Sequence, residues 1–255
     1  MPGGLRRKLN HWLDLWEDPE EQTEAAPHSP SPQSSRRLTV NPALERHFPL
    51  LSGQMLKGKV LVPLCGRSPD MAWLAQQDLL TVGVECSRRA IARFAADQGF
   101  ELFAGDAESG GALVPWFAGP CTIFEGDWFD STPDALGGDF DMAYDHAALA
   151  VVDPVRRPAY AEVLRGLLRP TARLLVVVPE FDEDSVDAAL TALGPHSVGM
   201  AELQELFPDF VLQVLNEEMG AVDSDAFRRL RAAGLSSAVE RWLLLERSVR
   251  SYSFP

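Results

Sequence analysis

The sequence is poor in cysteine and lacks long apolar runs. Its three cysteines, Cys65, Cys86 and Cys121, are odd in number and form no C-x-x-C pair, so we expect no disulfide framework and favour a reducing, cytoplasmic location. No apolar run approaches the roughly 20 residues that span a bilayer. Acidic residues also interrupt any secretory apolar stretch near the start. The sequence therefore predicts neither a membrane partner nor a signal peptide.

Basic side chains are also scarce. The 255 residues include 23 basic and 37 acidic side chains, which gives a net charge of −14. A surface of that sign repels a phosphate backbone, so nucleic acid is not expected as a partner, and self-repulsion favours a monomer. The apolar fraction of 46% is typical of a globular protein, which limits any disorder to segments.

The first 40 residues differ from the rest of the chain. Apolar side chains recur at helical spacing, with Trp12 and Trp16 four residues apart, which predicts a short docking helix. The run from residue 17 to 35 is rich in proline and acid and has no large apolar residue, which predicts a mobile linker or lid. The helix could close over a ligand or simply pack on the core. We therefore separate residues 1–40 from a main domain of residues 41–255.

From residue 59 onward, strand and helix patterns alternate as in a doubly wound sheet. Nearly continuous apolar strands are expected at residues 59–64, 81–85, 122–127, 140–145 and 172–178. Covering helices are expected at residues 71–77, 88–98, 154–168 and 200–206. Two later apolar stretches, 210–215 and 241–246, can pair antiparallel at the sheet edge. The fold class is thus α/β, mostly parallel, with helices on both faces.

Ligands in such folds bind beyond the carboxyl ends of the strands. The first strand leads into Gly66, which allows a tight turn and a close approach of the backbone to a ligand. Neither G-x-G-x-x-G nor G-x-x-x-x-G-K-[ST] occurs, so a nucleoside without phosphates and a plain turn both remain possible. Glu85 ends the second strand, where a carboxylate can accept from both hydroxyls of a ribose or cap the next helix.

Two further strand ends have polar side chains. Asp127 follows the third strand and could accept from an adenine amino group while a neighbouring aromatic ring covers the base. His146, directly after Asp145, follows the fourth strand and could titrate near neutral pH, although it could equally be a structural hydrogen-bonding residue. The sequence has no H-E-x-x-H or C-x-x-C motif and no carboxylate cluster, so no metal site is predicted.

Several segments together resemble the thiopurine S-methyltransferase family. They are W-x-x-x-W at residues 12–16, VLVPLCGRSPDMAWLA at 60–75, VGVECSRRAI at 82–91, FEGDWF at 124–129, FDMAYDHAAL at 140–149, RRPAY at 156–160 and GPHSV at 194–198. The resemblance implies a Rossmann-like class I methyltransferase fold with a seven-stranded sheet, an antiparallel edge strand, and S-adenosylmethionine as methyl donor. S-adenosylhomocysteine would be the product.

The resemblance also implies roles for individual residues. Trp12 and Trp16 fall where the family's tryptophans cover the cofactor. Leu64 and Gly66 would line its methionine side, and Glu85 would bind the ribose. Asp127 and Trp128 would flank the adenine, and His146 would contact the cofactor or the acceptor.

Three departures from the family pattern lie on the acceptor side. His146 replaces the arginine of D-R-x-A-L, residues 194–197 read GPHS instead of a GPPF-like segment, and the family's Phe-His pair is missing. We therefore expect methylation of the sulfur of a small aromatic or heterocyclic thiol that need not be a thiopurine. His146, with Asp145 beside it, would deprotonate the acceptor or stabilise its thiolate. The alternatives are a halide, thiocyanate or metalloid methyltransferase of the same fold, and a catalytically silent protein that binds S-adenosylmethionine.

Overall fold

The computed structural model describes residues 39–106, 111–186, 195–219, 234–235 and 237–248. The predicted N-terminal helix, with Trp12 and Trp16, lies outside the described residues, as does the whole of the proposed linker or lid at residues 17–35. The division at residue 40 therefore stays a prediction.

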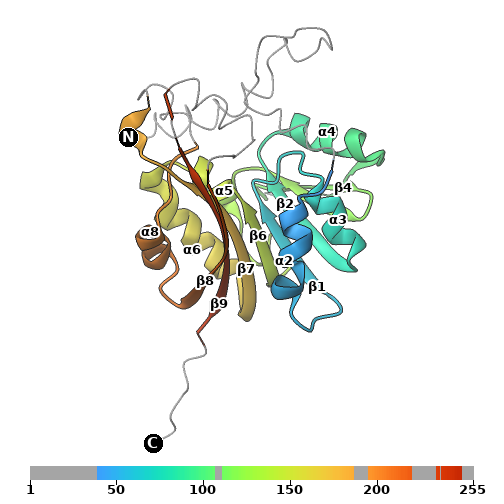
Figure 1. Cartoon of the computed structure of the whole chain (residues 1–255). Coiled ribbons are helices and arrows are strands. Elements are labelled where there is room, and N and C mark those ends of the chain that lie inside the picture. Colours follow the sequence, from blue (N-terminus) through green and yellow to red (C-terminus); the bar gives the residue numbers. More distant parts are fainter. Residues whose placement is uncertain (1–38, 107–110, 187–194, 220–233, 236, 249–255) are drawn as a thin grey trace, which may run out of the picture.

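The described residues form one nine-stranded sheet in the order β3-β4-β5-β2-β1-β6-β7-β9-β8 (Figure 1). Its five central strands, β5, β2, β1, β6 and β7, are parallel to one another, while β3, β4, β8 and β9 pair antiparallel at the two sides. The strands are β1 Gly58–Pro63, β2 Leu79–Glu85, β3 Leu102–Ala104, β4 Val114–Ala118, β5 Cys121–Glu125, β6 Phe140–His146, β7 Leu168–Glu180, β8 Phe210–Met219 and β9 Val239–Arg247.

All seven predicted strands are present, but the predicted count of seven is wrong. The two additional strands are β3 and β4, which pair antiparallel outside β5. The first is three residues long, and the second contains Pro115, a residue that argues against a strand interior because it lacks a backbone N–H. The antiparallel pair β8–β9 confirms the predicted pairing at the sheet edge.

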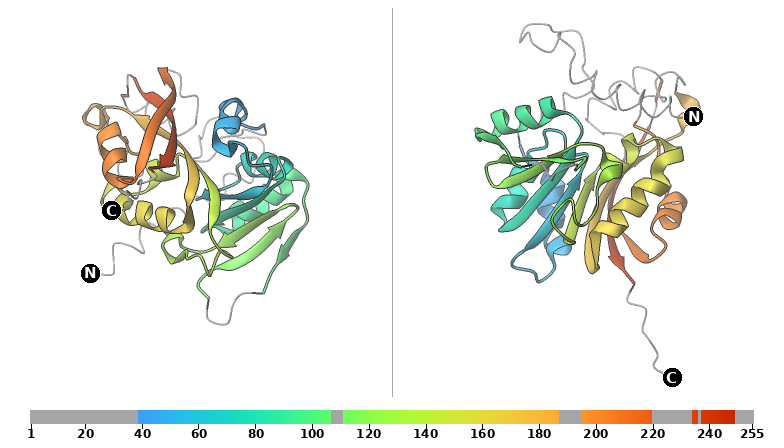
Figure 2. Two further views of the ribbon diagram at one scale, coloured as in Figure 1. Left: turned by 90° about the horizontal axis from the view of Figure 1, so that it is seen from below. Right: turned by 180° about the vertical axis from the view of Figure 1, so that it is seen from behind.

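Helices cover both faces of the sheet (Figure 1; Figure 2). One face carries α2 Pro42–Ser52, α3 Asp70–Gln76 and α4 Arg88–Gln98; the other carries α5 Ala148–Val151, α6 Arg157–Leu167 and α8 Met200–Leu206. The central strands are buried on both sides: in β1, Val60 packs on the α2 side and Leu61 on the α6 side. None of the described helices is long and apolar enough to cross a membrane.

Helix α2 was not predicted, and it proves important for the site. It begins with Asn41 as N-cap, whose side chain accepts from the backbone N–H of Ala43, and has Pro42 in its first turn. Both are standard signals for the start of a helix. The helix places Asn41 beside the carboxyl end of β6.

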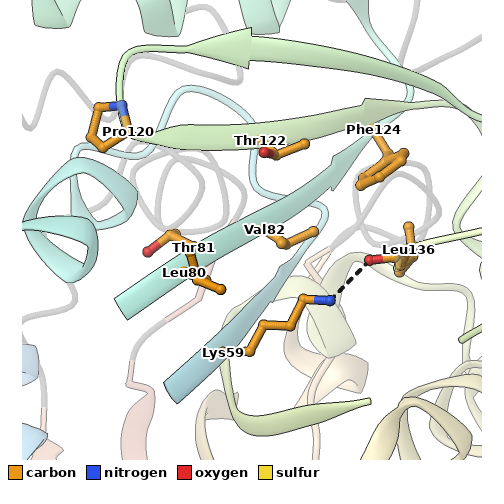
Figure 3. Close-up of a pocket in the computed structure, with 8 residues that line it drawn as sticks. All are labelled: Lys59, Leu80, Thr81, Val82, Pro120, Thr122, Phe124 and Leu136. Atoms are coloured by element: carbon orange, nitrogen blue, oxygen red, sulfur yellow. Dashed lines mark hydrogen bonds between the residues drawn. The ribbon is translucent and has the colours of Figure 1, made fainter. Parts of the chain in front are cut away.

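A cavity of about 250 Å³ lies near the amino ends of β1, β2 and β5 (Figure 3). Its lining includes Lys59, Leu80 and Pro120, which stand at or next to the beginnings of these strands. The amino group of Lys59 is bound to the carbonyl oxygens of Leu136 and Gly137, at 3.2 and 2.6 Å. This cavity is therefore at the opposite end of the strands from the predicted site residues.

Candidate functional site

The predicted site residues come from neighbouring strands at the carboxyl edge of the sheet. Strand β1 lies between β2 and β6. After β1 the chain first adds β2 on one side, and it later adds β6 and then β7 on the other side. This is the switch point at which open α/β sheets bind ligands. Gly66, Glu85 and His146 follow or end these three adjacent strands.

The structure brings Gly66 and Glu85 into direct contact. The backbone N–H of Gly66 donates to Oε2 of Glu85 at 2.9 Å, and the N–H of Ser87 donates to Oε1, also at 2.9 Å. The Glu85 side chain is therefore fixed across the ends of β1 and β2. Ser87 is the N-cap of α4, and its Oγ accepts from the N–H of Ala90 at 3.3 Å. Glu85 is therefore not the helix cap.

The electrostatics of Glu85 follow from its burial. The residue is 6% exposed, and desolvation raises the pKa of its carboxyl group, while the bonds from Ser87, Cys86 and Gly66 oppose that rise. A carboxylate has about four lone-pair positions. Backbone N–H groups occupy one position on each oxygen, and Oε1 also accepts from the thiol of Cys86 at 3.4 Å, so a hydroxyl group of a ligand would be accepted chiefly at Oε2.

Asp127 and Trp128 have different surroundings. Asp127 is partly exposed at the end of β5, and its Oδ1 accepts from the N–H of Phe129 at 3.1 Å. Trp128 is 2% exposed and its ring lies 5.1 Å from that of Tyr160, in the core beneath α6. Its buried Nε1 has no hydrogen-bond partner among the described residues. Trp128 thus presents little ring surface but holds an unused N–H donor.

The two predicted catalytic residues lie on opposite faces of the sheet, because side chains alternate along β6. Asp145 is fully buried on the α6 side; its carboxylate accepts from Tyr160 Oη at 2.8 Å and from the N–H of Leu149 at 3.1 Å. Burial raises the pKa of Asp145 to about 6. The structure therefore does not bring Asp145 and His146 together as a pair.

His146 is half-buried on the α2 side. Its ring lies 5.8 Å from that of Tyr144 and 6.0 Å from that of Trp242, and its Nε2 is 3.3 Å from Nδ2 of Asn41. Two buried aromatic rings thus pack beside His146 at the end of β6. No sequence motif points to Asn41, Tyr144 or Trp242 as site residues; the Asn41–Pro42 pair, typical of the start of a helix, is the one local signal among them.

Two strand ends at the switch point have unusual backbone. Leu64, after β1, has φ of 44°, and Ala147, after β6, has φ of 63°. Residues other than glycine rarely adopt this left-handed region, and such strain collects where a ligand constrains the chain. Leu64 and Ala147 therefore lie at the carboxyl ends of two neighbouring strands, β1 and β6.

The segment that departs from the family pattern at residues 194–197 is described from Pro195 onward. The N–H of His196 donates to the carbonyl oxygen of Ala150 at 2.8 Å, and Ser197 Oγ accepts from the N–H of Phe181 at 2.9 Å. The fully buried Arg157 donates to the carbonyl oxygen of Ser197 at 2.9 Å. These bonds hold the segment against the carboxyl end of β7, on the same edge as His146.

The residues present fit S-adenosylmethionine. The site offers a fixed carboxylate for hydroxyl groups, a second carboxylate for an amino group, and the unpartnered indole N–H of Trp128. No cluster of three metal-binding side chains was found within the described ranges.

Comparisons with known proteins agree with this arrangement. The family model described as Thiopurine S-methyltransferase (TPMT) matches residues 34–248. A thiopurine S-methyltransferase from Pseudomonas putida is 36% identical over 79% of this chain and 88% of its own. Another from Methylococcus capsulatus is 30% identical over 92% of this chain and 98% of its own.

Solved structures are alike in fold. A methyltransferase from Anabaena variabilis has a TM-score of 0.57 at 14% identity and covers 94% of this chain and 95% of its own. The 1,6-didemethyltoxoflavin-N1-methyltransferase of Burkholderia thailandensis, solved with S-adenosylhomocysteine, has a TM-score of 0.51 at 17% identity and covers 89% and 93%. The predicted resemblance is confirmed: the chain belongs to the thiopurine S-methyltransferase family and is an S-adenosylmethionine-dependent methyltransferase.

Proposed function

We propose that the protein transfers a methyl group from S-adenosylmethionine to the sulfur of a small aromatic or heterocyclic thiol. The observation that carries the proposal is the contact of Gly66 with Glu85 at the switch point, next to the aromatic surroundings of His146 on β6. Family membership supports the transfer to sulfur. The partly exposed ring of His146, which packs on the buried rings of Tyr144 and Trp242, supports a planar acceptor.

Each residue has a separate task in this proposal. Glu85 accepts from the ribose hydroxyls, and Leu64 and Gly66 form the backbone turn along the methionine part. Asp127 accepts from the adenine amino group, and Trp128 donates its indole N–H on that side. When bound, S-adenosylmethionine supplies an electrophilic methyl group.

The chain chiefly aligns the acceptor. Holding the two reactants at about 3 to 3.5 Å in line can supply about 7 to 11 kcal/mol of the barrier. A thiol has an ordinary pKa of about 8.5, so a few per cent is thiolate at neutral pH and no strong base is needed. His146 is positioned to act on the acceptor sulfur. Asp145 acts indirectly, by fixing the end of β6 through Tyr160 and Leu149.

The proposal also includes the N-terminal tryptophans. Trp12 and Trp16 cover the bound cofactor. Replacing both with alanine should weaken the binding of S-adenosylmethionine, measured by calorimetry, without lowering the melting temperature of the free protein. If both residues merely pack on the core, the melting temperature falls in the absence of cofactor.

The proposal is tested by supplying S-adenosylmethionine with a panel of acceptors and measuring S-adenosylhomocysteine. The panel holds aromatic thiols, a thiopurine, thiocyanate, iodide, and matched phenols and amines, with products identified by mass. Product on the aromatic and heterocyclic thiols is expected. Product mainly on thiocyanate or iodide, or none on any acceptor while the cofactor binds, contradicts the proposal.

A binding variant separates the cofactor site from the acceptor. Glu85→Gln removes the charge and one of the two acceptor oxygens, so the loss of about 1.5 to 3 kcal/mol predicts binding of S-adenosylmethionine about 10- to 150-fold weaker. Glu162→Gln, the same change at an exposed position of α6, is the matched control and should bind normally. Equal binding by both variants excludes Glu85 from the ribose site.

A further inference from the structure

The orientation of the Asn41 side chain follows from the helix that it caps. Its Oδ1 accepts from the N–H of Ala43 at 3.0 Å. A backbone N–H can only donate, so the oxygen end of the amide must face Ala43. The Nδ2 end therefore faces His146, at 3.3 Å from its Nε2.

This orientation determines where the proton of His146 is. An amide NH₂ group can only donate, so Nε2 of His146 must accept. A neutral imidazole that accepts at one nitrogen carries its proton on the other, which places it on Nδ1. Protonation of Nε2 would set two donors against each other.

Asn41 is itself held by a buried chain of hydrogen bonds. Its backbone N–H donates to Oδ1 of Asp70 at 2.8 Å, and Tyr144 Oη donates to Oδ2 of Asp70 at 3.0 Å. Asn41, Asp70 and Tyr144 are 6%, 2% and 0% exposed. Tyr144 stands two residues before His146 on β6, so the chain of bonds starts and ends on the same strand. Such a satisfied buried network is rigid.

We propose that Asn41 is a positioning residue that holds His146 as the neutral Nδ1–H tautomer. His146 then acts on the acceptor as a hydrogen-bond donor that stabilises the thiolate, and its Nε2 does not serve as the base. This inference rests on the proposed function for its thiol acceptor, but the tautomer itself does not depend on turnover.

Among the described residues, further charged and titratable groups lie on the elements that pack around His146. Tyr144 is on β6, and Asp70 of α3 is reached through Asn41. His47 of α2 lies 5.8 Å from the ring of Trp242, whose Nε1 donates to Glu240 on β9 at 3.1 Å. The backbone N–H of Asn41 contacts the carboxylate of Asp70, and its side-chain NH₂ group contacts His146, so Asn41 links the two residues through donor groups.

The experiment is long-range ¹H–¹⁵N NMR of the histidine rings in the free full-length protein, with His146 assigned from His146→Gln. The native protein should show the Nδ1–H tautomer at neutral pH. Asn41→Ser and Asn41→Asp both keep a good helix cap. In the serine variant the tautomers should mix. In the aspartate variant a carboxylate oxygen faces Nε2, so the titration midpoint of His146 should rise by about 1 to 3 pH units.

Activity gives the second readout. Asn41→Ser should lower kcat for the best thiol by about 10- to 100-fold, as expected for a misplaced group, with the Kd for S-adenosylmethionine unchanged. A native His146 with its proton on Nε2, or a tautomer that is unmoved by both substitutions, overturns the inference. If the tautomer is as stated but no thiol is methylated, the proposed function fails and the role of Asn41 in fixing the tautomer stands.

Discussion

Asp145 should reduce stability at neutral pH, because the folded protein buries its charge. Its carboxyl is fully buried, and burial raises its pKa from 3.8 to about 6. At about 1.4 kcal/mol for each pH unit, the difference amounts to about 3 kcal/mol. We predict that Asp145→Asn stabilises the protein at pH 7 by up to this amount. Asparagine fits the site, since its Oδ1 can accept from Leu149 and its NH₂ group can donate to Tyr160 Oη.

The pH dependence has a definite sign. The pKa is raised in the folded state, so between pH 3.8 and about 6 the folded protein holds more protons on this group than the unfolded chain does. The free energy of unfolding contributed by Asp145 therefore falls as the pH rises through this window and stays low above it. The asparagine variant lacks that dependence.

The assay is urea denaturation of the native protein, Asp145→Asn and the exposed control Asp134→Asn at several pH values from 4 to 7. The difference between the native protein and Asp145→Asn isolates this one group, because all others titrate in both. The difference should be small at pH 4 and grow toward pH 7, with the variant more stable, while the control shows no such trend. An asparagine variant that is less stable at pH 7 than at pH 4, relative to the native protein, would refute the reasoning.

Three further variants test neighbouring features. Tyr160→Phe removes a donor from the buried carboxylate of Asp145, so it should cost about 1 to 3 kcal/mol at pH 7 and less at pH 5; an equal loss at both pH values would count against it. Gly83→Ala puts a Cβ 2.6 Å from Cys65 Sγ, which should cost about 1 to 3 kcal/mol of overpacking, and an unchanged melting temperature would contradict that contact. Ala147→Gly relieves a left-handed backbone, so the free energy of unfolding measured in urea should rise by about 1 to 2 kcal/mol. A fall in that free energy would show that no strain is stored at this position.

Much of the site could be predicted because buried parallel strands read as continuous apolar runs, and their carboxyl ends mark the ligand edge. Gly66 and Glu85 are predicted at neighbouring strand ends, and in the structure the N–H of Gly66 lies 2.9 Å from Oε2 of Glu85. His146 is also predicted at the same edge.

Other features could not be predicted because they depend on tertiary contacts. Asn41 and His146 are 105 residues apart in sequence, and no local pattern reports their contact. Adjacency in sequence also made Asp145 and His146 look like a pair, although alternation along a strand sends them to opposite faces. The core position of Trp128 depends on its packing against Tyr160, which the sequence does not show.

The outer strands of the described sheet bear on its association with other chains. Unpaired backbone groups on an edge strand invite pairing with a strand from another molecule, and short or kinked edges prevent it. On one side β3 is three residues long; on the other, β8 is ten residues long but shifts register between Val214 and Asn216. Such a bulge bends the strand and interrupts a regular ladder. Both edges therefore disfavour growth of the sheet from one molecule into the next, even though β8 exposes Val211 and Val214.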